Sequence, residues 1–257
     1  LEDAARTRAE PLWAAVASAL RAQTRVDEGD VVAATADLAR ADVDLGPVYL
    51  ASPVAFRLLD ALAMVYARLR VHDRLDDVRE RIESTIDAWT PLERAIHWAG
   101  WCSELAVRAM EPVAMGEGAP ATQSLRQAVE IGARIDALPP AAVPQPLRRG
   151  VSAVRALAAA YRGRPAEALR VLGQDAFGEA RQLPPVERQI ATLAAMRAHA
   201  HVGSIASARS LDDAAGQTRS TLVHLVLSVC RARERLWLET HAGGQVVPVL
   251  NRLVDLL

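Results

Sequence analysis

The chain has 257 residues, of which 51% are apolar, 24% are charged and 4% are aromatic, and its formal net charge is −1. This apolar content is enough for a continuous core, whereas the near-neutral charge supplies no field that would draw the protein to nucleic acid or to an anionic membrane. All 30 basic residues are arginines, which GC-rich codon usage explains better than 30 separate anion contacts. No apolar run approaches the roughly 20 residues that a membrane-spanning helix needs.

The motifs of the common enzyme classes are absent from the sequence, which has no phosphate-binding loop, no nucleotide-binding glycine cluster and no nucleophile elbow. His199 and His201 are two residues apart, so on a helix they point in different directions and do not form a zinc-binding pair. Cys102 and Cys230 belong to no metal-binding motif, and we expect buried thiols in a reducing cytoplasm. These features predict a non-catalytic cytoplasmic protein without a cofactor or a metal ion.

Helical stretches rich in Ala, Leu and Arg follow one another along the whole chain, and a short turn interrupts each of them. The six turns lie at Gly29, Arg70, Gly116, Gly163, Gly203 and Gly244. They interrupt, in this order, residues 1–44, the stretch that begins at 54, the stretch that begins at 90, residues 147–172, the stretch that begins at 183, and residues 221–257. The turns recur about every 40 to 47 residues, a period that holds two helices. We therefore predict six helix pairs.

Local signals support this division. Thr90 and Glu93 flank Pro91 and form a capping box, which predicts a helix start at this position. Four prolines lie within residues 138–146, and this segment is predicted to be a hinge or a change of direction. The acidic pairs Asp76-Asp77 and Asp212-Asp213 are expected near helix starts, where carboxylates are favoured by the helix dipole.

The spacing of small residues resembles that of tetratricopeptide repeats. In that family a Gly lies in the turn and an Ala lies five residues later, where the two helices cross. The matching pairs here are Gly29 with Ala34, Gly163 with Ala168 and Gly203 with Ala208, and Ala41 and Ala215 match the second small position. The other units depart from the pattern, with Leu75, Ala121 and Val249 at the crossing position. The period also exceeds the 34 residues of the family, which leaves a HEAT-like solenoid as the structural alternative.

The resemblance implies an all-α fold, a right-handed α-solenoid of about six antiparallel helix pairs. It implies one repeat domain over residues 1–257, with units one to three in 1–137, the hinge at 138–146 and units four to six in 147–257. The chain lacks an initial Met and stops inside a helical run, so we expect it to be a fragment of a longer protein. In its composition, rich in Arg and Ala, it is similar to the repeat regions of actinobacterial multidomain signalling proteins, some of which continue into a diguanylate cyclase domain.

First helices of such units line the concave groove, so their aromatic and basic side chains are candidates for partner binding. These candidates are Arg68, His97, Trp98, Trp101, Arg155, Arg197, Arg231 and Arg235. Convergent arginines would favour an acidic ligand or one that ends in a carboxylate. The alternatives are a core seam for the two tryptophans and solvated helix faces for the arginines.

The cluster Arg231, Arg233, Glu234, Arg235 and Trp237 is a further candidate for anion binding or for docking a downstream domain. Alternatively it neutralises itself, with Glu234 paired to Arg231 on the helix surface.

Solenoids present long surfaces to partners, so the sequence predicts a protein- or peptide-binding regulatory module that controls an attached output domain. One alternative is a scaffold that forms a homodimer ahead of a diguanylate cyclase domain, and another is a small-molecule-sensing domain. An enzyme would require titratable groups that converge in a pocket, and the spacing of residues identifies none. No nucleic-acid or membrane partner is expected.

Overall fold

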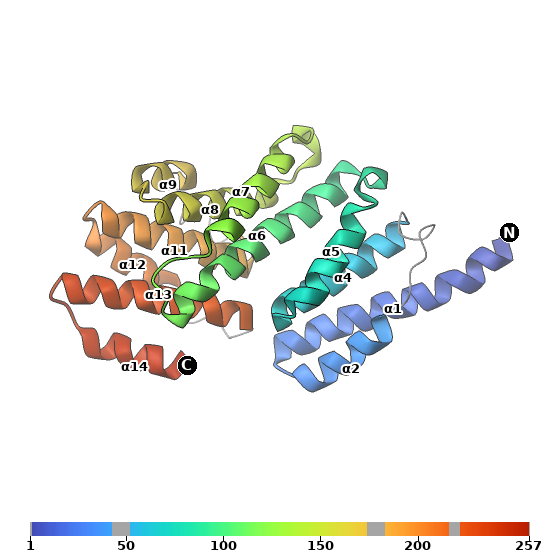
Figure 1. Ribbon diagram of the computed structural model, residues 1–257, viewed down its shortest axis with the longest axis horizontal. Coiled ribbons are helices and arrows are strands. Elements are labelled where there is room, and N and C mark those ends of the chain that lie inside the picture. The colour runs from blue at the N-terminus through green and yellow to red at the C-terminus, as the bar shows by residue number, and fades with distance from the viewer. Residues whose placement is uncertain (1, 43–51, 174–182, 216–221, 257) are drawn as a thin grey trace. The chain divides into compact units, whose positions relative to one another are not determined.

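The computed structural model describes residues 2–42, 52–173, 183–215 and 222–256 (Figure 1). In these residues the chain forms twelve α-helices, two short 3₁₀ helices and no β-strand, which confirms the all-α prediction. The chain divides into two compact units, Leu1–Arg94 and Ala95–Leu257. Within the same described ranges, every helix is too short or too polar to cross a bilayer.

The first unit is built around the helix α4. It contains α1 (Glu2–Glu28), α2 (Val31–Ala41), α4 (Pro53–Leu69), α5 (His72–Glu83) and the 3₁₀ helix η1 (Ile86–Ala88). Helix α1 packs against α2 and α4, and α4 packs against α5. The side chains of α4 that recur at three- and four-residue steps face the core, as their spacing predicts, and the buried ones include Leu58, Leu59, Leu62 and Val65.

The second unit is built around α8 and α11. Its helices are α6 (Pro91–Met115), which begins at the end of the first unit, α7 (Thr122–Asp136), α8 (Gln145–Tyr161), α9 (Pro165–Leu172), α11 (Pro185–His201), α12 (Ile205–Ala215), α13 (Leu222–His241) and α14 (Val246–Leu256). Helix α8 packs against α7, α9 and α11, while α11 also packs against α12 and α13. Both central helices bury many alanines, whose small side chains allow neighbouring helices to approach on several sides.

The predicted capping box is confirmed at the start of α6. The Glu93 carboxylate accepts hydrogen bonds from the Thr90 backbone N–H at 2.9 Å and from its hydroxyl at 2.7 Å, and Thr90 Oγ1 accepts the Glu93 N–H at 3.3 Å. Asp30 and Ser52 cap α2 and α4 through their side-chain oxygens. These caps satisfy backbone donors that have no partner inside the helix.

Among the described residues, six helices end in the same backbone turn. Each reaches a residue with positive φ, and the next residue donates its N–H to the carbonyl oxygen five residues earlier, at 2.8 to 3.0 Å. This pattern is the Schellman motif, which satisfies carbonyls at the helix end while the chain reverses. The positive-φ residues are Gly29, Arg70, Gly116, Gly163, Gly203 and Gly243.

The last of these turns lies one residue before its predicted position at Gly244. Gly243 has the positive φ of 65°, whereas Gly244 has a different constraint. A Cβ atom added to Gly244 would overlap the Glu239 carboxylate and would lie 2.5 Å from Arg209 Nη2. Gly244 is therefore required by the close approach of an ion pair to the backbone, and Gly243 makes the turn.

The small residues expected at helix crossings are buried. Ala34, Ala168 and Ala208 are fully buried, as is Ala41, whereas the side chain of Ala215 lies outside the described residues. Leu75, five residues after Arg70, is buried as well, Val249 is buried six residues after Gly243, and Ala121 is half-buried ahead of α7. After the turns at Gly29, Arg70, Gly163 and Gly203, the residue five positions later is therefore buried whether its side chain is small or branched.

The proline-rich segment at 138–146 lies inside the second unit. It forms the 3₁₀ helix η2 (Pro140–Ala142), and α8 begins directly after it with Pro146 in its first turn. Arg148 donates a hydrogen bond to the Pro140 carbonyl and ties α8 to the segment. Since the division between the units falls at Arg94, the role of this segment as a hinge stays a prediction.

Arg70 is the one non-glycine residue with positive φ among the described residues, at φ 59° and ψ 30°. We expect Arg70→Gly to raise the free energy of unfolding by about 0.5–1 kcal/mol, because a side chain strains this conformation. As a matched control, Arg162→Gly changes a residue with φ −87° at the end of α8 and should lower stability slightly. Urea unfolding measures both. A loss of stability in Arg70→Gly would show that the bond from its guanidinium to the Ala67 carbonyl outweighs the backbone strain.

Candidate functional site

The predicted aromatic residues lie on α6 and are largely packed. Trp98 is buried, and the Arg134 guanidinium carbon lies 5.7 Å from the centre of its ring. His97 is also buried, and its ring centre is 5.8 Å from that of the half-buried Trp101. Their packing agrees with the core-seam alternative, and a role for them in partner binding stays a prediction.

The predicted arginines have several different environments. Arg68 lies on α4 in the first unit, and the other candidates belong to the second. Arg155 on α8 forms an ion pair with Asp136 of α7. Arg197, Arg231 and Arg235 lie on the neighbouring helices α11 and α13.

A buried carboxylate, that of Asp212, joins α12, α13 and α14. Arg231 donates to its Oδ1 at 2.8 Å and to its backbone carbonyl at 3.1 Å, and Arg252 of α14 approaches its Oδ2 at 2.7 Å. The side chains of Asp212 and Arg231 are each only 1% exposed. Burial lowers the pKa of Arg231, and the Asp212 charge opposes this change. Arg231 is thus held inside the unit by its acidic partner.

Arg235 points to the same side of α13 and is also fully engaged. Its Nε donates to Glu239 at 2.6 Å, and its Nη1 donates to the Arg209 carbonyl at 3.0 Å and to Asp213 at 3.2 Å. Arg209 forms a two-bond contact with Glu239, at 3.0 and 2.6 Å. These contacts tie α12 to α13.

Two expectations about the acidic residues were wrong. Helix α5 begins at His72 and α12 at Ile205, so Asp76 lies one turn and Asp212 two turns inside a helix, where the helix dipole gives little support. Asp212 is stabilised by arginines instead. Glu234 pairs with Arg197 of α11 and not with Arg231, because the packing of α11 against α13 brings the two together.

Arg197 lies at the contact of three helices. Its guanidinium carbon is 4.1 Å from the ring centre of Tyr161 on α8, and its Nη1 donates to Glu234 on α13. The Tyr161 hydroxyl is 3.4 Å from the same carboxylate oxygen. Burial and the Glu234 charge raise the pKa of Tyr161 well above its usual range, so this phenol stays protonated and able to donate.

A cavity of about 250 Å³ opens beside this contact, at the end of α6 and between α11 and α13, whose positions can be followed in Figure 1. We call it the Arg233 cavity. It is lined by Val113, Gly116, Gly118, Arg197, His201, Arg233, Glu234 and Trp237. Side chains from both α11 and α13 therefore face one small space, which is lined by polar and aromatic groups.

Arg233 differs from its neighbours on α13. Within the described part of the chain its guanidinium forms no ion pair or hydrogen bond, and its Nε is shielded from solvent. The backbone of Gly116 lies next to it, and a Cβ there would be 3.3 Å from Arg233 Nη2. A cation without an acidic partner in a cavity wall is suited to bind an anion.

An aromatic surface adjoins this guanidinium. Trp237 lies one helical turn after Arg233 and is 43% exposed. The ring of His201 stacks on it with centres 6.1 Å apart, and His241 lies 4.3 Å from it. The cavity thus combines a cation with a flat apolar wall, an arrangement that can hold a ligand with an anionic group and a ring or an aliphatic chain.

The two buried thiols of the second unit lie close to backbone carbonyl groups. The thiol of Cys102 lies 3.2 Å from the Ala128 carbonyl oxygen, and that of Cys230 lies 3.4 Å from the Met110 carbonyl oxygen. Burial raises the pKa of each thiol to about 12, which agrees with the predicted buried cysteines. Within the described ranges, no three His, Cys, Asp or Glu side chains gather closely enough to hold a metal ion.

Comparison of the chain with protein-family models, with curated proteins and with solved structures finds no match in any of the three. The function has to be inferred from the side chains themselves.

The sequence predicts a binding cluster on α13, but the two arginines predicted to bind a partner, Arg231 and Arg235, are paired inside the unit. Arg231 and Arg235 are four residues apart and share one face of α13, whereas Arg233 and Trp237 share the opposite face. The tryptophan at four-residue spacing from Arg233 was the available signal, because exposed tryptophan beside arginine is typical of binding sites.

Asp212 and Asp213 are adjacent but differ in burial, so they form a matched pair for mutation. Asp212→Asn leaves the buried guanidinium of Arg231 without a charged partner, and we expect it to lower the free energy of unfolding by about 3 kcal/mol or more. Asp213→Asn removes an exposed ion pair and should cost less than about 1 kcal/mol. Urea unfolding compares the two. Equal losses would contradict the central role of Asp212.

Asp60 of α4 is a half-buried residue in the first unit. Burial raises its pKa to about 6 against the pull of the Arg79 charge. The folded state therefore keeps a proton that the unfolded chain releases near pH 4, and stability contributed by this group falls as the pH rises from about 4 to about 6.

Asp60→Asn removes the carboxyl group that causes this pH-dependent loss of stability. We therefore expect the free energy of unfolding of the variant to rise relative to that of the native chain as the pH rises, by up to about 3 kcal/mol above pH 7. Unfolding curves at pH 4 to 7.5 measure the difference. A constant difference across this range would show that the Asp60 pKa is the same in the folded and unfolded chain.

Proposed function

We propose that this chain is a non-catalytic recognition module that binds an anionic group of a partner protein or peptide in the Arg233 cavity. The observation that carries the proposal is the contrast on α13: Arg231 and Arg235 are paired with buried acids, whereas Arg233 faces the cavity without an acidic partner among the described residues. A ligand carboxylate or phosphate would complete its hydrogen bonds.

The lining of the cavity supports binding over chemistry. None of its eight residues carries a hydroxyl or a thiol, and the His201 ring stacks on Trp237 with its Nδ1 2.9 Å from the Arg197 carbonyl oxygen. Glu234 is occupied by Arg197 and Tyr161. The exposed face of Trp237 adds apolar contact area, which is how interfaces anchor a partner.

We further propose that the helices stack as a right-handed α-solenoid of six antiparallel pairs similar to tetratricopeptide repeats. The same turn at six positions, followed in most cases by a buried residue five positions later, supports this arrangement. In this proposal the protein is cytoplasmic and bacterial, and ligand binding alters the stacking so that an attached signalling domain responds.

A dimerisation module is the second candidate. Val247, Leu250 and Val254 of α14 are exposed at three- and four-residue steps and form an apolar stripe that two copies of the chain could share about a two-fold axis. Light scattering over a range of concentrations tests it. A mass that rises to a dimer, and returns to a monomer in Val254→Asp, would support this candidate.

The recognition proposal is tested with fluorescein-labelled peptides of equal length, one set rich in Asp and Glu and one set neutral. We expect acidic peptides to bind and Arg233→Gln to weaken them by about tenfold or more, because a charged hydrogen bond is lost. Arg162→Gln removes the same charge from an exposed site and should have little effect. Fluorescence anisotropy gives the affinities. Equal losses in both variants, or no preference for acidic peptides, would contradict the proposal.

A further inference from the structure

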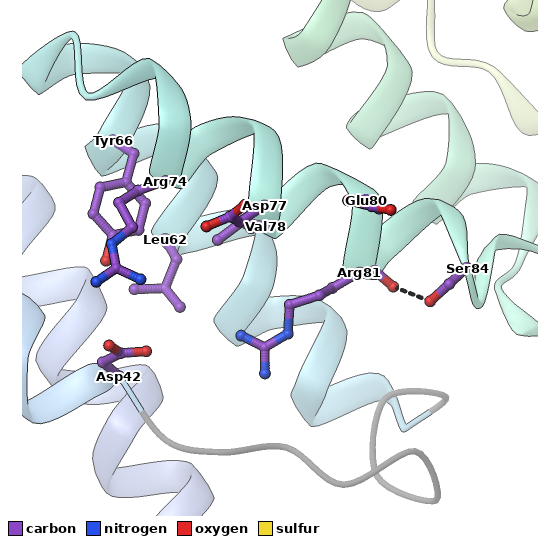
Figure 2. A pocket seen from close by; sticks show the side chains of 9 residues that line it. All are labelled: Asp42, Leu62, Tyr66, Arg74, Asp77, Val78, Glu80, Arg81 and Ser84. Carbon is purple, nitrogen blue, oxygen red and sulfur yellow. Dashed lines mark hydrogen bonds between the residues drawn. The ribbon is translucent and has the colours of Figure 1, made fainter.

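A second cavity, of about 400 Å³, lies in the first unit where α4 and α5 meet the end of α2 (Figure 2). We call it the Tyr66 cavity. It is lined by Asp42, Leu62, Tyr66, Arg74, Asp77, Val78, Glu80, Arg81 and Ser84. Leu62 and Val78 are buried and Tyr66 is half-buried, so the floor is apolar, whereas the charged residues form the rim.

The rim carries charges of both signs that do not neutralise one another directly. Among the described residues, the side chains of Asp42, Arg74, Asp77 and Arg81 make no ion pair within 4.0 Å and no side-chain hydrogen bond. Arg74, Asp77 and Arg81 recur at three- and four-residue steps along α5, and that spacing normally allows pairing on the helix surface. Here the charged groups remain apart and face a common space.

Figure 2 shows how these groups are arranged. The Arg74 guanidinium lies beside the Tyr66 ring, and the Asp42 carboxylate points toward both from the other side of the cavity. The Arg81 guanidinium extends into the same space, while the Glu80 carboxylate points away from it. Burial raises the pKa of Tyr66, Asp42 raises it further and Arg74 opposes the rise, which agrees with both charges being close to this phenol.

The groups that face the cavity are therefore two carboxylates and two guanidinium groups, with no net charge. A simple cation would be repelled by the arginines and a simple anion by the aspartates. A molecule that carries one ammonium and one carboxylate a few ångströms apart meets a partner for each charge. The apolar floor leaves room for an attached side chain.

We propose that the Tyr66 cavity binds a small zwitterion of the α-amino acid class, with its ammonium between Asp42 and Asp77 and its carboxylate on Arg81 and Arg74. The ligand side chain lies on Tyr66 and Leu62. This site is separate from the Arg233 cavity and does not depend on the function proposed there. It makes the first unit a sensor of a free metabolite.

The experiment uses the full chain and each of the twenty free L-amino acids as probes. We expect at least one of them, at about 10 mM, to raise the unfolding temperature, because a ligand that binds only the folded state stabilises it. Calorimetric titration then compares that amino acid with its N-acetyl derivative and its amide, each of which lacks one of the two charges. Each derivative should bind at least about tenfold more weakly.

Variants separate specific binding from a general solvent effect of amino acids. Asp42→Asn and Arg81→Gln should each reduce affinity at least about tenfold, whereas the exposed Glu28→Gln and Arg57→Gln, which remove the same charges elsewhere in the unit, should not. Circular dichroism verifies that every variant is folded. The proposal is overturned if no amino acid stabilises the chain, if the two singly charged derivatives bind as well as the amino acid, or if the cavity variants bind as the controls do.

Discussion

The left-handed turn at the end of a helix is the constraint on which the packing of this chain depends. A helix ends with carbonyl groups that lack partners, and here the Schellman turn satisfies them while it sends the chain back along its own helix. The direction of the next helix is then set within a few residues, so the position five residues after the turn meets the previous helix. Arg70 makes this turn in spite of its side chain, which shows how strongly the packing on either side selects the conformation.

Arginine then determines how the polar interior is arranged. Buried acids at Asp37, Asp212, Glu234 and Glu239 are each approached by one or more guanidinium groups from a different turn or a different helix. The planar guanidinium offers several donors, so one arginine can satisfy a carboxylate and a backbone carbonyl together. On α13 the paired arginines Arg231 and Arg235 are structural, whereas the Arg233 Nε has no hydrogen-bond partner in the described residues.

The local features of the fold could be predicted because they depend on short stretches of sequence. The capping box at Thr90, five of the six turns and the buried alanines follow from spacing and backbone preference. The ion pairs could not be predicted, since they depend on how far each helix is rotated about its axis. A rotation that places Arg231 beside Asp212 also turns Arg233 toward the cavity. That rotation is set by the packing of α11, α12 and α13 together.

The two buried thiols of the second unit provide a way to measure local opening of its helix contacts. Cys102 lies where α6 meets α7, and Cys230 lies where α13 meets α6. With a pKa of about 12, neither thiol forms the reactive thiolate at neutral pH while it is enclosed. Alkylation of either one therefore requires its own helix contact to separate. The two labelling rates compare the opening free energies of two contacts on the same helix, without any added probe residue.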